Sequence, residues 1–265
     1  MVSRMIGIFD SGLGGLTVVN AIMKQLPGYD LLYFGDTART PYGTKSQKTV
    51  IGYSFENTDF LIKKGAEIII IACNTASSVA TLGLSEKYNI PIFEVITPAV
   101  EDALIVSKKH RIGIIGTRAT VNSNIYKIKI QAKDPDAHVY SNACPLLVPL
   151  VEEGWMKKPE TRMIIKKYLH PLKGRQIDTL ILGCTHYPLL KDIIQQKIGK
   201  RVKIIDSSLS VAAQIKEYLK KNPEIDGLLS KEGRASFFVS DVTDQFIKTA
   251  KKILKKDIHL EHVVQ

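Results

Sequence analysis

Short runs of branched aliphatic residues alternate with amphipathic segments along most of the chain. The aliphatic runs predict strands at 5–9, 31–34, 67–72, 91–95, 111–116, 138–140, 179–182, 202–205 and 236–239. The segments of helical periodicity predict helices at 16–26, 49–64, 77–88, 121–131, 161–169, 189–197, 208–221 and 241–255. Uninterrupted apolar strands are typical of parallel sheets that helices cover on both faces. The pattern therefore predicts an α/β fold of the doubly wound type.

Two parts of this pattern occur twice. The run 6–9 resembles 112–115, which lies 106 residues further along, and the segment 69–75 resembles 180–186, which lies 111 residues further along. The conserved order favours a duplicated α/β unit, although short aliphatic runs also recur by chance in parallel sheets. We expect two similar doubly wound parallel-sheet domains related by a pseudo-two-fold axis, with the active site in the cleft between them. The predicted domains are 1–96 plus 207–265 for the first and 97–206 for the second.

Cys73 and Cys184 occupy corresponding places in the two repeats, each directly after a predicted strand. Ligands of open α/β sheets bind beyond the carboxyl ends of the strands, so paired domains would point both thiols into one cleft. A single cysteine after a strand is commonly a core residue. The pairing and the polar residues that follow favour a functional role for these two. Cys144 is followed by a proline and apolar residues, and we expect it in the core.

Polar side chains follow each paired cysteine where a helix is expected to begin. Free N–H groups at a helix N-terminus favour anions and lower the pKa of a cysteine placed there. Asn74, Thr75 and Thr185 can hydrogen-bond a carboxylate or an ammonium group. His186, two residues after Cys184, is a candidate proton partner for that thiol.

Asp10 ends the first predicted strand at the same edge of the sheet as Cys73. It is either a cap for the following loop or an acid–base or orienting group in the cleft. The glycines at 12, 14 and 15 do not form the dinucleotide-binding fingerprint, so we predict no nucleotide cofactor. They allow backbone N–H groups to approach a small anion closely.

Composition narrows the classes of protein to consider. The formal net charge of the 265-residue chain is +11, but its lysines are scattered in pairs without a nucleic-acid-binding motif. We interpret them as a solvated surface and expect no nucleic acid partner. The spacing of the three cysteines predicts neither a metal site nor a disulfide framework. No run of 18 apolar residues occurs, and Met1–Asp10 lacks a signal-peptide core, so we expect a cytoplasmic protein with no membrane partner.

Seven segments together resemble the glutamate racemases of the aspartate/glutamate racemase superfamily. They span most of the chain in the order that the family keeps, and the two cysteine motifs are the most specific. The segments are FDSGLGGLTV at 9–18, YFGDT at 33–37, PYG at 41–43, ACNTAS at 72–77, IGT at 115–117 with Thr120, LVPLVE at 147–152, and GCTHYPL at 183–189.

The resemblance implies interconversion of L- and D-glutamate without pyridoxal phosphate or metal, by a homodimer that supplies D-glutamate for peptidoglycan synthesis. It implies that Cys73 and Cys184 are the acid–base residues, that Asp10 assists Cys73, and that His186 and Glu152 assist Cys184. Because Glu153 follows directly, which of the two glutamates faces the site stays open. The implied substrate-binding residues are Ser11, Pro41, Tyr42, Gly43, Asn74, Thr75, Thr117, Thr120 and Thr185.

Three other functions stay open at this stage. A racemase for aspartate or another acidic amino acid would use the same two thiols. A non-catalytic anion-binding or redox-sensing protein would have thiols that oxidise readily but would racemise nothing. A decarboxylase-like relative would depend on one cysteine only. The two-base racemase requires both sulfurs to reach one carbon from opposite faces.

Overall fold

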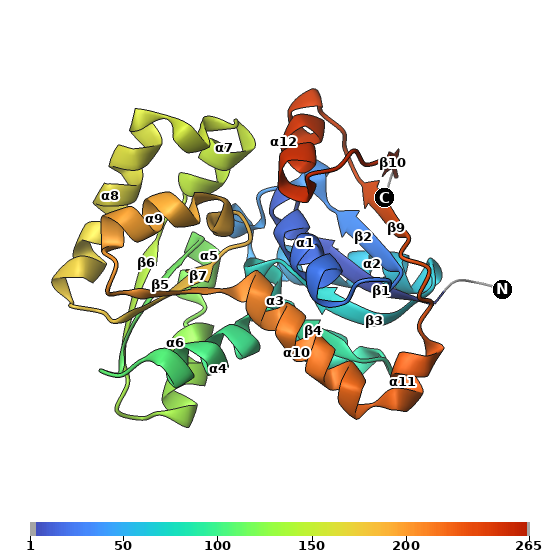
Figure 1. Ribbon diagram of the computed structural model, residues 1–265, viewed down its shortest axis with the longest axis horizontal. Coiled ribbons are helices and arrows are strands. Elements are labelled where there is room, and N and C mark those ends of the chain that lie inside the picture. Colours follow the sequence, from blue (N-terminus) through green and yellow to red (C-terminus); the bar gives the residue numbers. More distant parts are fainter. Residues whose placement is uncertain (1–3, 264–265) are drawn as a thin grey trace.

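The computed structural model describes residues 4–263 and has two parallel sheets (Figure 1). The strands of the first are β1 (Met5–Asp10), β2 (Leu31–Gly35), β3 (Ala66–Ile71), β4 (Ile92–Glu94), β9 (Ala235–Val239) and β10 (Leu260–His262). Those of the second are β5 (Arg111–Gly116), β6 (His138–Ala143), β7 (Thr179–Gly183) and β8 (Lys203–Asp206). The first sheet has the order β10-β9-β2-β1-β3-β4, and the second has the order β6-β5-β7-β8.

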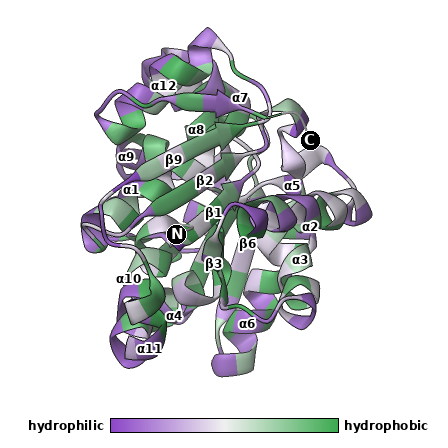
Figure 2. Cartoon of the chain, turned by 90° about the vertical axis from the view of Figure 1, so that its right-hand side faces the viewer, coloured by the Kyte–Doolittle hydropathy of each residue, from purple (hydrophilic) through white to green (hydrophobic). Residues whose placement is uncertain are grey.

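Helices cover both sheets. The α-helices are α1 (Leu16–Gln25), α2 (Gln47–Lys63), α3 (Asn74–Lys87), α4 (Ile96–Val106), α5 (Arg118–Asn122), α6 (Ile125–Lys133), α7 (Leu147–Glu152), α8 (Pro159–Gly174), α9 (Lys191–Ile198), α10 (Ser207–Lys221), α11 (Pro223–Leu228) and α12 (Asp244–Leu254). Single 3-10 turns are η1 (Leu13–Gly15), η2 (Thr37–Arg39), η3 (Tyr42–Thr44), η4 (Trp155–Lys157) and η5 (Tyr187–Leu190). Figure 2 shows β2 and β9 as hydrophobic strands, while much of the outer surface of α11 is hydrophilic.

Successive side chains of a strand point to opposite faces of its sheet. Helices pack on both faces of each sheet, so both sets of side chains are buried. In the first sheet, Ile8 packs with α1, α10 and α12, whereas Phe9 packs with α2 and α3. In the second sheet, Leu182 packs with α8 and α9, whereas Ile181 packs with α4 and α6. This arrangement explains the uninterrupted apolar runs and confirms the predicted α/β class with doubly wound sheets.

Four strands of each sheet follow the same path. The order β2-β1-β3-β4 matches β6-β5-β7-β8, and all of these pairs are parallel. The repeated sequence runs lie in equivalent strands, β1 with β5 and β3 with β7. The chain leaves the first sheet after β4 and returns to it through α10, so β9 and β10 extend the first sheet beyond β2.

The structure differs from the predicted elements in several places. The helices α4, α7 and α11 and the strand β10 were not predicted, and prolines near the starts of the three helices hide their periodicity. The helix predicted at 121–131 is split into α5 and α6 because Asn124 adopts the left-handed conformation. The third helix begins at Asn74, directly after Cys73, three residues earlier than predicted. The first turn of this helix is mostly polar because it lies at the site. The apolar periodicity of the sequence therefore does not show where the helix begins.

Candidate active site

Cys73 and Cys184 line one small cavity between the two sheets. Both cysteines are 5% exposed. Cys184 directly follows the last residue of β7, and Cys73 lies two residues beyond the end of β3. The cavity is lined by Ser11, Pro41, Tyr42, Gly43, Cys73, Asn74, Thr75, Thr117, Val148, Cys184, Thr185 and His186. Since parallel strands end at one edge, the loops after β1, β3, β5 and β7 meet here.

The Cys73 thiol has a neutral partner. Its Sγ donates to Ser11 Oγ over 3.7 Å, and Cys73 is the residue before the first turn of α3. Burial raises the pKa of Cys73 to about 12, and the negative charge of Asp10 adds to this effect. The Ala76 N–H at the start of α3 lowers the pKa, as the sequence predicts, but burial outweighs it. Cys73 is therefore a thiol at neutral pH.

The Cys184 thiol has a charged partner. His186 Nδ1 lies 3.9 Å from Cys184 Sγ, and His186 Nε2 lies 3.0 Å from Glu152 Oε1. Burial lowers the pKa of His186, but its hydrogen bonds to Cys184 and Glu152 outweigh burial and raise it to about 10. The ring is therefore an imidazolium at neutral pH, held between two groups that carry or can carry negative charge.

Glu152 rather than Glu153 makes the contact with His186. Both glutamates line a second cavity, beside the first, which has Gly12, Thr40 and Asp241 among its other lining residues. Glu152 therefore lies behind His186, at the boundary of the two cavities.

Asp10 lies beneath the cavity and is fully buried. Its Oδ2 accepts hydrogen bonds from the N–H groups of Gly12 (3.0 Å) and Gly15 (2.8 Å), and its Oδ1 accepts one from Thr185 Oγ1 (3.2 Å). Burial raises the pKa of Asp10, while the charge of His186 and the backbone donors oppose that rise. Asp10 thus caps the glycine-rich turn and orients Thr185. Its hydrogen bonds reach the Cys184 side of the cavity, and it acts on Cys73 through its charge.

Two threonines, Thr75 and Thr117, line the cavity, and a third, Thr120, supports them. Thr75 Oγ1 lies 3.0 Å from Thr117 Oγ1 and 3.3 Å from Thr120 Oγ1, so the cluster joins α3 to the loop after β5. A Cβ on Gly43 would lie 2.5 Å from Thr117 Cβ, so this close approach requires glycine.

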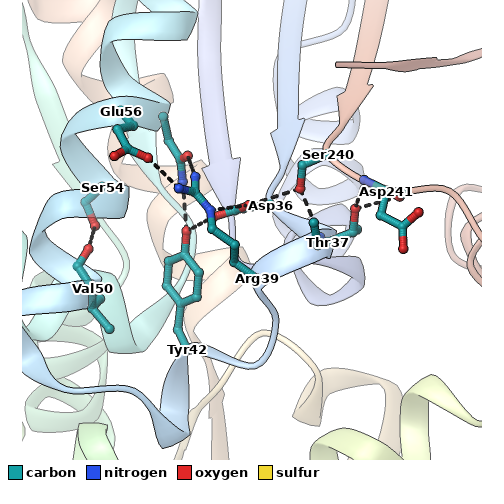
Figure 3. A network of polar contacts seen from close by, with 11 residues as sticks. Asp36, Thr37, Arg39, Tyr42, Val50, Ser54, Glu56, Ser240 and Asp241 are labelled. Carbon is teal, nitrogen blue, oxygen red and sulfur yellow. Dashed lines mark hydrogen bonds and ion pairs between the residues drawn. The ribbon is translucent and has the colours of Figure 1, made fainter. Parts of the chain in front are cut away.

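Tyr42, which lines the cavity, is held from behind by a polar network (Figure 3). Its hydroxyl donates to Asp36 and accepts from Asn57 Nδ2 at 3.1 Å. Arg39 Nε lies 2.9 and 2.7 Å from the two Asp36 oxygens, and Ser240 Oγ donates to Asp36 at 3.0 Å. Our sequence reasoning missed this network, although Asp36 directly follows β2 and Asp10 is the last residue of the neighbouring β1.

Two further groups at the site were also missed. Val148 lines the cavity, and Tyr126 donates a hydrogen bond to Asn74. Among residues 4–263, no three His, Cys, Asp or Glu side chains are grouped so that they could hold a metal ion. In the same part of the chain, no helix is long and apolar enough to cross a membrane.

Comparison with known proteins gives the family. The model of the Asp/Glu/hydantoin racemases matches residues 10–215. A glutamate racemase from Persephonella marina is 48% identical over 256 residues, covering 97% of this chain and 95% of the relative. The chain belongs to the Asp/Glu/hydantoin racemase family. The resemblance predicted from the seven motifs is therefore confirmed.

Solved structures of the family have the same fold over their whole length. The glutamate racemase isoform RacE1 of Bacillus anthracis superposes with a TM-score of 0.93 at 36% identity, with complete coverage of both chains. A Francisella tularensis glutamate racemase, solved in complex with D-glutamate, has a TM-score of 0.90 at 39% identity and covers 99% of this chain and 98% of that chain. The predicted enzyme class, an amino-acid racemase, is consistent with every relative named here.

Proposed function

We propose that this protein interconverts L- and D-glutamate without an added cofactor, using Cys73 and Cys184 as the two acid–base groups. The observation that carries the proposal is the position of the two thiols. They line one cavity, and each comes from the equivalent strand end of a different sheet. Similarity over the full chain to glutamate racemases supports glutamate as the substrate.

Racemisation needs a base on one face of Cα and an acid on the other. One sulfur, as a thiolate, takes the Cα proton, and the electron pair delocalises into the adjacent carboxylate. The other sulfur, as a thiol, then gives its proton to the opposite face of the same carbon. Each turnover leaves the protonation of the two sulfurs exchanged, so the product enantiomer is the substrate for the reverse step.

The surroundings of the sulfurs fit these roles. The imidazolium of His186 stabilises negative charge on Cys184, whereas buried Cys73 rests as a thiol. The NH2 group of Asn74, which has no partner among the described residues, can donate to a substrate carboxylate as charge builds up on it. The cavity is almost wholly buried, which excludes water and strengthens these interactions.

We further propose the domain division 1–96 plus 207–265 and 97–206, of which residues 1–3 and 264–265 lie outside the described part. The chain passes between the sheets at two places, from β4 into α4 and from β8 into α10. Hinge motion there would open the buried cavity to substrate. The family resemblance also supports a cytoplasmic homodimer that supplies D-glutamate for peptidoglycan.

Incorporation of solvent deuterium tests the proposal. Purified protein without added cofactor is incubated in deuterated water with L-glutamate, D-glutamate or L-aspartate. We expect deuterium at Cα and loss of optical rotation with both glutamates. Activity on aspartate alone would reject the substrate, and rapid thiol oxidation without exchange would support the redox-sensing alternative.

A further inference from the structure

Tyr126 connects the second sheet to the substrate cavity. It lies in α6, is 2% exposed, and donates from its hydroxyl to Asn74 Oδ1 over 2.6 Å. Asn74 is the first residue of α3, so this hydrogen bond joins elements that pack on different sheets. A Cβ on Gly183 would lie 2.9 Å from the backbone oxygen of Ile115 and 3.2 Å from the Tyr126 ring, so the glycine before Cys184 leaves room for both.

The other half of the Asn74 amide has no partner. Asn74 lines the cavity next to Cys73 and is 2% exposed, yet its Nδ2 makes no hydrogen bond to any described residue. Buried polar groups are nearly always paired, so an unpaired NH2 on a cavity wall indicates a ligand acceptor. Thr40 Oγ1 and Thr179 Oγ1 are also unpaired, but neither residue lines this cavity.

We infer that Tyr126 is a positioning residue, which holds the Asn74 amide with its NH2 toward the substrate so that it binds a carboxylate oxygen. An amide NH2 only donates and its carbonyl only accepts, so the direction of the side chain decides what it binds. The Tyr126 hydroxyl donates a hydrogen bond to the side-chain carbonyl oxygen of Asn74, so the NH2 group of Asn74 faces the cavity. Burial raises the pKa of Tyr126 well above its usual value, so the hydroxyl keeps its proton throughout the working range.

This inference rests on the proposed function, because it assigns a role in binding glutamate. It also links binding to the arrangement of the two sheets. Since the hydrogen bond runs from α6 to α3, a movement that separated these helices would release the amide. The NH2 is therefore oriented for a carboxylate only when the cavity is closed.

Tyr126→Phe tests the positioning role. We expect KM for both glutamate enantiomers to rise about 10-fold while kcat falls less than about 3-fold, since the amide can then rotate. Tyr88→Phe is the matched control, because it removes a hydrogen bond to Asp59 (2.6 Å), and neither residue lines the cavity. Unchanged KM in a folded Tyr126→Phe protein, with the wild type active, overturns the inference, whereas an inactive wild type refutes the proposed function instead.

Asn74→Asp tests the direction of the amide and needs no change at Tyr126. It replaces the NH2 with an oxygen of similar size, and we expect KM for glutamate to rise about 100-fold because a carboxylate is repelled. If the carbonyl faced the substrate ammonium group instead, the same variant would keep or lower KM. That result would overturn the assignment even if Tyr126→Phe failed to fold.

Discussion

The two cysteines hold equivalent places in two similar sheets, but their partners differ. Cys73 has the neutral hydroxyl of Ser11 at 3.7 Å, and Cys184 has the imidazolium of His186 at 3.9 Å, which is held in turn by Glu152. The repeated strands place two sulfurs on one cavity, and the loops after the strands set the charge around each. The fold therefore places the two sulfurs at equivalent positions, and a few loop residues give them different surroundings.

This difference matters because the two enantiomers of glutamate have equal free energies. The ratio kcat/KM must then be the same in both directions, whatever the protein does to either sulfur. A difference between the surroundings of the two sulfurs can therefore change only which of the two proton transfers limits the rate.

Removal of either thiol should abolish racemisation. We expect Cys73→Ala and Cys184→Ala each to lose at least about 1,000-fold in rate, because one face of Cα then lacks its acid or base. The remaining sulfur should still exchange the Cα hydrogen of one enantiomer with solvent, and the two variants should act on opposite enantiomers. Circular dichroism and proton NMR in deuterated water measure both effects.

Cys144 provides the control for the cysteine variants. It is fully buried, as predicted for a core residue, and does not line the cavity. Cys144→Ala should keep its rates within a few-fold. Exchange of the same enantiomer by Cys73→Ala and Cys184→Ala would contradict placement of the sulfurs on opposite faces.

Removal of the charge beside Cys184 should have the next largest effect. We expect His186→Asn to lower kcat/KM about 10- to 100-fold in both directions, because the Cys184 thiolate loses its cation. The primary isotope effect with Cα-deuterated substrate should rise for the enantiomer that Cys184 deprotonates. An equal rise for both enantiomers would mean that His186 does not distinguish the two sulfurs.

The sequence predicts the strand ends well and the groups behind them less well. Apolar runs located all but one of the described strands, and the motifs after β1, β2, β3, β5 and β7 named every residue that lines the cavity except Val148. Strand position alone brings those residues together, because parallel strands end at a common edge. These residues can therefore be identified from short motifs in the sequence.

Contacts between distant segments could not be predicted in this way. Tyr126 reaches Asn74 from 52 positions away, and Ser240 reaches Asp36 from 204 positions away. Neither pair belongs to a motif with a fixed spacing. The pKa of Cys73 was predicted in the wrong direction for a related reason, since burial depends on the packed fold and here outweighs the helix N-terminus.

Gly14 offers a steric test of the Cys184 side. A Cβ at this position would overlap Thr185 Oγ1 and lie 2.5 Å from His186 Nδ1. We expect Gly14→Ala to displace His186 and lower kcat/KM about 10-fold, somewhat less than removal of its charge. Gly52→Ala is the control, because a Cβ there meets no atom within 4 Å. Normal activity in a folded Gly14→Ala protein would show that the ring tolerates displacement.

The raised pKa of His186 predicts how stability depends on pH. Folding raises this pKa from 6.5 to about 10, so the folded protein binds the proton more tightly than the unfolded chain. The resulting stability is fully present below pH 6.5 and is lost as the pH rises through about 10. We expect the Tm of the wild type to fall by at least about 3 °C relative to His186→Asn over this range. The titration of Cys73 affects the Tm of both proteins equally. If the Tm of the two proteins changed in parallel with pH, a charged His186 would be contradicted.

Ser11 should give the smallest effect and the sharpest contrast with His186. Its hydroxyl is the only side-chain hydrogen-bond partner found for Cys73 Sγ among the described residues, and it lowers the pKa of that thiol slightly against the larger effect of burial. Because a neutral partner stabilises a thiolate less than a cation does, we expect Ser11→Ala to lower kcat/KM only about 3-fold. The isotope effect should rise for the enantiomer that Cys73 deprotonates, opposite to the one affected by His186→Asn. Ser54→Ala, which removes a buried hydroxyl bonded to Val50 O at 2.7 Å, should change neither quantity. If Ser11→Ala and His186→Asn raised the isotope effect of the same enantiomer, both residues would act on one sulfur, and the division of the site into two unequal halves would be wrong.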